Sequence, residues 1–175
     1  NALEAMIVFY NAVNALRQQL TPDVRIHGII THGGDAPNII PEYTKARFYI
    51  RANTIQVCEE VTERVIKAAE GAALSTGCEL KYTTYQNIVE DLIVYPKFNE
   101  LFTKVATDLG LEVEELDPNA SRGSTDAVNV SRVVPTIHPT IKICNDSITI
   151  HTEEFKQAAK SEAGDQAIID GEIIL

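Results

Sequence analysis

The sequence has few basic residues, few cysteines and no long apolar run. Its 175 residues carry 15 Lys and Arg against 25 Asp and Glu, a formal net charge of −10. Duplex nucleic acid and anionic membrane surfaces both need clustered basic residues, which a chain of this charge does not favour. No apolar run approaches the roughly 20 residues of a membrane-spanning helix. We therefore expect neither a nucleic acid nor a membrane as a partner.

The three cysteines also exclude a class of protein. Cys58, Cys78 and Cys144 are odd in number, far apart and without any C-x-x-C spacing. A disulfide framework or a thiolate metal site would need paired, regularly spaced cysteines. This usage is typical of free thiols in a reducing compartment, so we expect a cytoplasmic protein.

The first half of the chain shows clear periodic patterns. Apolar residues recur at spacings of three and four over residues 1–20, which predicts a helix. Residues 25–32 and 46–51 alternate as strands do, with Ile26, Ile30, Phe48 and Ile50 on the apolar side. The opposite, open face then carries His27, Arg47, Tyr49 and Arg51. Such a face suits an anionic or carbonyl ligand, although it could also be the solvated face of a two-layer domain.

A second helix and a third strand are expected next. Apolar residues at helical spacing follow Asn53, the expected N-terminal cap, and end before Gly77, the expected left-handed C-terminal residue. Residues 78–84 alternate weakly and predict a strand. The order α-β-β-α-β lacks only the first strand of a ferredoxin-like β-α-β-β-α-β domain. We therefore predict an α+β fold with a two-layer, ferredoxin-like domain over residues 1–85, in a chain cut from a longer protein.

The second half, residues 86–175, has a different pattern. Pro96 and Gly110 frame a helix, and residues 111–116 and 133–143 are candidate strands. A last helix begins near Thr152. This part is predicted to be an α/β segment.

The first motif is HGIITHGGDAPNIIPEY at residues 27–43, followed by YIRA at 49–52. It resembles the lid and dimerisation domain of the zinc amidohydrolases of the aminoacylase and carboxypeptidase G type, in the branch of the aminobenzoyl-glutamate hydrolases and β-alanyl-lysine dipeptidases. The resemblance implies that His27 binds the scissile carbonyl and that Asn38 and Arg51 bind the substrate carboxylate. It also implies a homodimer or a higher homo-oligomer.

The second motif resembles the C-terminal piece of the same family's catalytic domain. It comprises G-S-T-D at 123–126, N-V-S at 129–131, V-P-x-I-H-P at 134–139 and H-T-x-x-F at 151–155. The resemblance implies that His151 is a metal ligand. The loop of Gly123, Ser124 and Thr125 could bind a substrate carboxylate, or it could be an ordinary glycine turn.

Other parts of the family's site have no counterpart in the sequence. Family members hold two zinc ions per active site with an H-x-D motif and a general-base Glu, and neither is found here. We therefore expect a fragment of a zinc-dependent amidohydrolase or dipeptidase, inactive alone, whose parent cleaves a peptide or N-acyl amide bond of a small carboxylate-bearing substrate. The alternative is a non-catalytic ferredoxin-like dimerisation or binding module.

Overall fold

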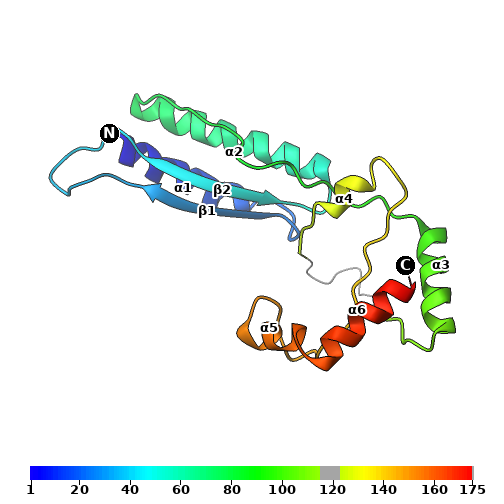
Figure 1. Ribbon diagram of the computed structural model, residues 1–175. Coiled ribbons are helices and arrows are strands. Elements are labelled where there is room, and N and C mark those ends of the chain that lie inside the picture. The colour runs from blue at the N-terminus through cyan, green and yellow to red at the C-terminus, as the bar shows by residue number, and fades with distance from the viewer. Residues whose placement is uncertain (115–122, 175) are drawn as a thin grey trace. The chain divides into compact units, whose positions relative to one another are not determined.

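The computed structural model describes residues 1–114 and 123–174, which form two compact units (Figure 1). The first unit is Asn1–Asp91 and the second begins at Leu92. The elements in chain order are α1 (Ala2–Arg17), β1 (Arg25–His32), β2 (Lys45–Arg51), α2 (Ile55–Thr76), α3 (Pro96–Asp108), α4 (Ala127–Val130), α5 (Glu153–Ala159) and α6 (Glu162–Ile174). The predicted α+β class is confirmed by this mixture of helices with an antiparallel sheet.

Strands β1 and β2 form an antiparallel hairpin, and their side chains lie on the two faces that the sequence predicted. Ile26 lies opposite Ile50, and Gly28 lies opposite Phe48, on one face. His27 lies opposite Tyr49 on the other face. The register shifts between Ile30 and His32, where β1 carries an irregularity before the loop. Both predicted strands are therefore confirmed, with the side-chain alternation that the sequence indicated.

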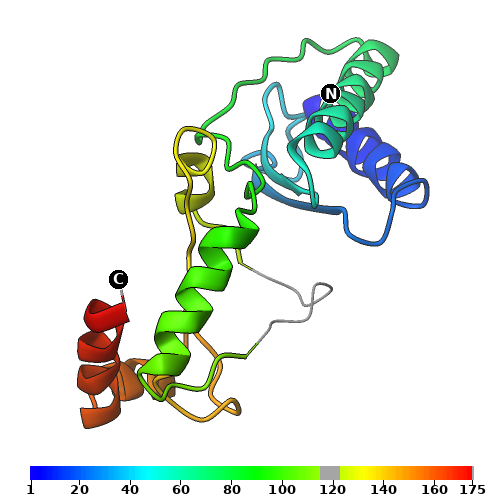
Figure 2. The same cartoon turned by 90° about the vertical axis from the view of Figure 1, so that its right-hand side faces the viewer.

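Helices α1 and α2 pack side by side against the apolar face of this hairpin (Figure 2). Larger apolar residues pack around a core of valine and isoleucine side chains. The core side chains come from α1, the α1–β1 connection, β1 and α2, and they are Val13, Val24, Ile26, Val61 and Val65. Val13 is fully buried, and Val61 is 3% exposed. Because the helices cover only this face, the face with His27 is left open to other groups.

The residues at the two ends of α2 show how the sequence begins and ends this helix. Gly77 adopts a left-handed conformation with φ 67°, as predicted, and its N–H donates to Leu74 and Ala73 carbonyls. At the other end the predicted cap, Asn53, is wrong. Thr54 is the N-cap, and its hydroxyl accepts a hydrogen bond from the Val57 N–H at 3.4 Å. A threonine hydroxyl satisfies a free helix N–H as an asparagine does.

The predicted strand at 78–84 is wrong, because these residues contain no strand. A strand needs a neighbour, and the described sheet has only β1 and β2. The segment instead runs to Tyr85, whose ring contacts that of Tyr49 on the open face of β2.

The second unit is helical in its described residues. Helix α3 begins at Pro96, as predicted, and Gly110 beyond its end has φ 80°. The predicted final helix is confirmed, with Thr152 as its cap, but it is interrupted between α5 and α6. Buried residues are few and small here, including Ala106 and Ala167.

The predicted strand at 133–143 is also wrong. Pro135 and Pro139 lack the N–H groups of a strand ladder, and Val133 instead donates to the Val130 carbonyl in a turn after α4. Of the strand predicted at 111–116, residues 111–114 have no strand and the rest lies outside the described residues. No helix in the described part of the chain is long and apolar enough to cross a membrane.

Candidate functional site

The open face of the β1–β2 hairpin brings together several of the polar residues singled out from the sequence. The cross-strand pairs on this face are Arg25 with Arg51, His27 with Tyr49, and Ile29 with Arg47. Directly opposed residues have Cβ atoms about 4.5–5.5 Å apart, and diagonal neighbours stand roughly 7–8 Å apart. His27 and Arg51 are diagonal neighbours, so one small substrate can contact both.

The charge of this face is opposite to that of the whole chain. Three arginines lie on it and neither strand contributes an acidic residue, whereas the sequence carries a net charge of −10. Asp23, just before β1, accepts a hydrogen bond from the Asn53 N–H at 3.4 Å, and hydrogen bonds together with the charge of Arg25 lower the pKa of its carboxyl group. Arg25 donates to the backbone carbonyls of Pro22 and Val24. A cluster of guanidinium groups attracts carboxylates.

Tyr85 adds an aromatic ring to this face from the segment after α2. Its ring centroid lies 5.8 Å from that of Tyr49, and the Arg47 guanidinium carbon lies 5.5 Å from its centroid. Desolvation, followed by the neighbouring Tyr49 phenol, raises the pKa of Tyr85, and the Arg47 charge lowers it. Tyr85 therefore stays a neutral hydrogen-bonding group at physiological pH.

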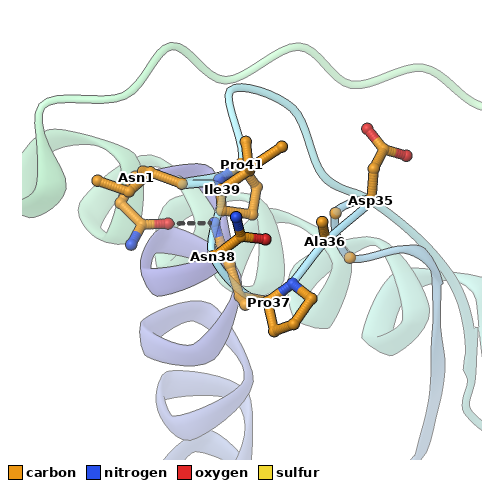
Figure 3. A pocket seen from close by; sticks show the side chains of 11 residues that line it. Asn1, Asp35, Ala36, Pro37, Asn38, Ile39 and Pro41 are labelled. Atoms are coloured by element: carbon orange, nitrogen blue, oxygen red, sulfur yellow. Dashed lines mark hydrogen bonds between the residues drawn. The ribbon is translucent and has the colours of Figure 1, made fainter.

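Asn38 lies apart from His27 and Arg51, in the loop that joins the two strands. This loop and the start of α1 line a pocket of about 500 Å³ (Figure 3). The Ala2 N–H donates to the Pro41 carbonyl at 2.9 Å, and the Thr44 hydroxyl donates to the Ala2 carbonyl at 3.0 Å. Arg51 stands at the other end of β2, so the described residues do not bring Asn38 to the group formed by His27 and Arg51.

His151 lies in the second unit, directly before Thr152, the N-cap of α5, and is exposed. Its φ is 67°, a left-handed conformation that, within the described chain, no other non-glycine residue adopts. Strain of this kind is often found at functional sites. Thr152 fixes the backbone on both sides, since its hydroxyl donates to the Thr149 carbonyl at 2.7 Å and accepts from the Phe155 N–H at 3.2 Å.

The loop of Gly123, Ser124 and Thr125 stands before the short helix α4. The Thr125 hydroxyl accepts a hydrogen bond from the Ala127 N–H at 3.3 Å, so it has a local structural partner. Gly123 is exposed, and a Cβ there would meet nothing within 4 Å. Ser124 is exposed as well. This geometry is compatible with both interpretations of the loop.

The described residues do not form a metal site by themselves. No group of three or more His, Cys, Asp and Glu side chains among them could hold a metal ion. Catalytic zinc sites use three protein ligands, and His151 alone supplies one. The set therefore does not fit a bound zinc ion without further ligands.

Comparison with known proteins finds a family model and several relatives that resemble this chain. Residues 1–76 match the family model described as a peptidase dimerisation domain. The Xaa-Arg dipeptidase of Mus musculus is 38% identical over 165 residues, covering 93% of this chain, and that of Homo sapiens is 36% identical over 168 residues. Residues 1–76 are a peptidase dimerisation domain. One of the subunits of the p-aminobenzoyl-glutamate hydrolase of Escherichia coli is 34% identical over 77 residues, which cover 43% of this chain.

These relatives are much longer than this chain. This chain spans 38% of the mouse dipeptidase, 37% of the human one and 16% of the bacterial hydrolase subunit. The matched dimerisation domain contains α1, β1 and β2 and reaches the end of α2. The family resemblance read from the two sequence motifs is therefore confirmed.

One residue of the open face could not be identified from the sequence, namely Tyr85. Tyr85 follows the strand wrongly predicted at 78–84, and no periodicity links it to β2. The sequence offers no signal for its contact with Tyr49, since the two lie 36 positions apart and the segment between them takes its path from packing.

Proposed function

We propose that this chain is part of a metal-dependent dipeptidase or amidohydrolase that cleaves a peptide or N-acyl amide bond of a small substrate with a free carboxylate. The observation that carries the proposal is the open sheet face of a peptidase dimerisation domain, where His27 and Arg51 stand together among strand residues that include three arginines and no acidic residue. The similarity to two Xaa-Arg dipeptidases over 93% of the chain supports a dipeptide substrate.

The two residues have separate roles in this proposal. His27 donates a hydrogen bond to the oxygen of the scissile carbonyl, where negative charge develops during hydrolysis. Arg51 binds the substrate carboxylate through its two-pronged guanidinium group. Asn38 also binds a substrate carboxylate in this proposal. Because it lies in the loop at the other end of the hairpin, it serves a different active site from the one that His27 and Arg51 of the same chain serve.

A homodimer would provide that arrangement. Each strand of the described two-stranded sheet has an edge that pairs with no other described strand. Open edges of this kind pair readily with another strand. In the full-length protein we assign the free edge of β1 to a second copy of the chain. The free edge of β2 is assigned to an additional strand that completes a ferredoxin-like sheet.

The metal of the proposed enzyme is zinc, two ions per active site, and His151 supplies one ligand. Its exposed ring and its left-handed backbone, held by Thr152, support this role. The other ligands and the general base come from parts of the full-length protein outside this sequence. In the same proposal, the substrate side of the catalytic segment is lined by Gly123, Ser124 and Thr125. We also propose that the protein acts in the cytoplasm.

Steady-state kinetics of the full-length enzyme with alanyl-arginine test the two roles. His27→Ala is expected to lower kcat by roughly 10²–10³, the usual cost of removing one donor to a developing oxyanion. Arg51→Ala is expected to raise KM mainly, because it removes binding shared by the ground state and the transition state. Arg64→Ala, on an exposed position of α2, is the matched control. An unchanged kcat in His27→Ala would show that the imidazole does not contact the reacting carbonyl.

A further inference from the structure

Tyr49 occupies the centre of the open sheet face. It stands between Arg47 and Arg51 along β2 and directly opposite His27 on β1. Alternate residues of a strand are about 6.6 Å apart, and opposed Cβ atoms are about 5 Å apart. A carboxylate held by Arg51 is therefore within reach of the Tyr49 phenol as well.

The ring of Tyr49 is held in place from one side. Tyr85 contacts it with a centroid distance of 5.8 Å and an interplanar angle of 52°, and Arg47 lies against the Tyr85 ring at 5.5 Å. A tilted aromatic pair with a cation beside it is a favourable arrangement. Both tyrosines nevertheless remain open to solvent, with Tyr49 47% and Tyr85 46% exposed. Core packing therefore does not account for the pair.

The contacts of the three arginines differ. Arg25 is bound to backbone carbonyls and Arg47 to the Tyr85 ring, whereas the Arg51 guanidinium has no hydrogen bond or ion pair with the described residues. Arg51 is thus the arginine available to an incoming anion. The hydroxyl group nearest to it along the strand is that of Tyr49, two positions away.

We propose that Tyr49 donates a hydrogen bond to the substrate carboxylate bound by Arg51, and that Tyr85 is a positioning residue that holds the Tyr49 ring in place. This assignment rests on the proposed function, because it uses the same carboxylate. The Tyr49 hydroxyl adds a neutral hydrogen-bond donor to the charged guanidinium group of Arg51, so the site recognises the shape of the carboxylate as well as its charge. A phenol is suited to this, since it stays protonated well above neutral pH.

The test is the kinetics of full-length Tyr49→Phe with two substrates, alanyl-arginine and its C-terminal amide. The substitution keeps the ring and removes only the hydroxyl group. For alanyl-arginine, KM is expected to rise roughly tenfold with kcat nearly unchanged, as for the loss of one hydrogen bond to a charged group. For the amide, which has no carboxylate, KM is expected to stay as in the wild type. An equal rise for both substrates would show a structural effect and overturn the proposal.

The role of Tyr85 has its own pair of variants. Tyr85→Ala removes the ring beside Tyr49 and is expected to raise KM for alanyl-arginine, again without effect on the amide. Tyr85→Phe keeps the ring contacts with Tyr49 and Arg47 and is expected to restore KM. Tyr82→Ala, at a 66% exposed position of the same segment, is the control. A Tyr85→Ala enzyme with wild-type KM would overturn the positioning role.

Arg51→Ala separates this proposal from the proposed function. A raised KM in Arg51→Ala with an unchanged KM in Tyr49→Phe would overturn the Tyr49 contact alone. If neither variant changed KM for alanyl-arginine, both the carboxylate site and the Tyr49 contact would be overturned.

Discussion

The aromatic ring of Phe48 fills the space in which a side chain on Gly28 would stand. A Cβ at Gly28 would lie 2.3 Å from Cε1 of Phe48 and 2.6 Å from its Cζ, across the two strands. The Phe48 ring cannot easily move away, because it packs against Phe9 and Tyr10 of α1 with centroid distances of 5.0 Å and 5.3 Å. The absence of a side chain at Gly28 is therefore what lets the ring lie between the sheet and the helix.

Gly28→Ala is expected to destabilise the protein by about 1–3 kcal/mol, as overpacking of a filled core does. Urea unfolding of the purified protein would measure the change. Gly71→Ala is the matched control, because Gly71 lies inside α2 and a Cβ there would meet nothing within 4 Å. That control should stabilise the protein by about 0.5–1 kcal/mol through helix propensity. Equal stability of the two variants would contradict the close contact of Gly28 with Phe48.

Elements with a strong internal period could be predicted from the sequence. The alternation around Ile26 and Phe48 indicated both strands and their faces, and the helical spacing around Val61 indicated α2. The strands predicted at 78–84 and 133–143 failed because a weakly alternating segment becomes a strand only where a partner pairs with it. Partners are decided by the fold as a whole, and prolines at 135 and 139 further weaken pairing.

The candidate site could be predicted only where its residues share a strand face. His27 and Arg51 follow from alternation, and the register confirms that they share that face. The distance of Asn38 from them depends on the path of the loop, and the contact of Tyr85 depends on the segment after α2. Neither path leaves a periodic signal in the sequence. The catalytic and binding roles given to these residues remain predictions.

Ser131 is fully buried and connects the segment before α3 to α4 in the second unit. Its hydroxyl accepts from the Ile93 N–H at 2.9 Å and donates to the Val128 carbonyl at 2.6 Å, while its own carbonyl accepts from the Tyr95 hydroxyl at 3.2 Å. Ser131→Ala would leave the Ile93 N–H without this partner, so we expect a loss of about 1–3 kcal/mol in the free energy of unfolding. Ser124→Ala, at an exposed position, is the control, and comparable stability of the two variants would contradict the role of Ser131.

Cys58 is expected to react slowly with iodoacetamide. Burial, and to a smaller extent the charge of Glu59, raises the pKa of its thiol, while a hydrogen bond with Thr62 lowers it. The raised pKa means that the folded state keeps the proton to a higher pH than the unfolded state does. The protonated Cys58 thiol therefore contributes fully to the stability of the folded state below the unfolded pKa of about 8.5. This contribution is lost as the pH rises through the pKa of the folded state.

Mass spectrometry of the folded protein at pH 8 should show alkylation at Cys58 only after Cys78 and Cys144. In urea the three thiols should react at similar rates, which serves as the control. Faster reaction of Cys58 in the folded protein would contradict the protected position of its thiol, which donates to the Ile50 carbonyl at 3.4 Å.

Zinc binding by residues 1–175 alone is the last prediction. His151 is the one zinc ligand proposed in this segment, and no group of three ligating side chains lies among the described residues. A single imidazole loses most of the affinity of a complete site, because closed zinc sites draw on three or four protein ligands together. We expect the purified segment to keep less than one equivalent of zinc after dialysis, as measured by elemental analysis, and to hydrolyse no alanyl-arginine. The full-length protein, treated identically, should keep two equivalents and lose activity with a chelator. One or more tightly bound equivalents in a segment of verified mass, with chelator-sensitive activity, would show that these residues hold a complete site and that His151 has further partners within the segment.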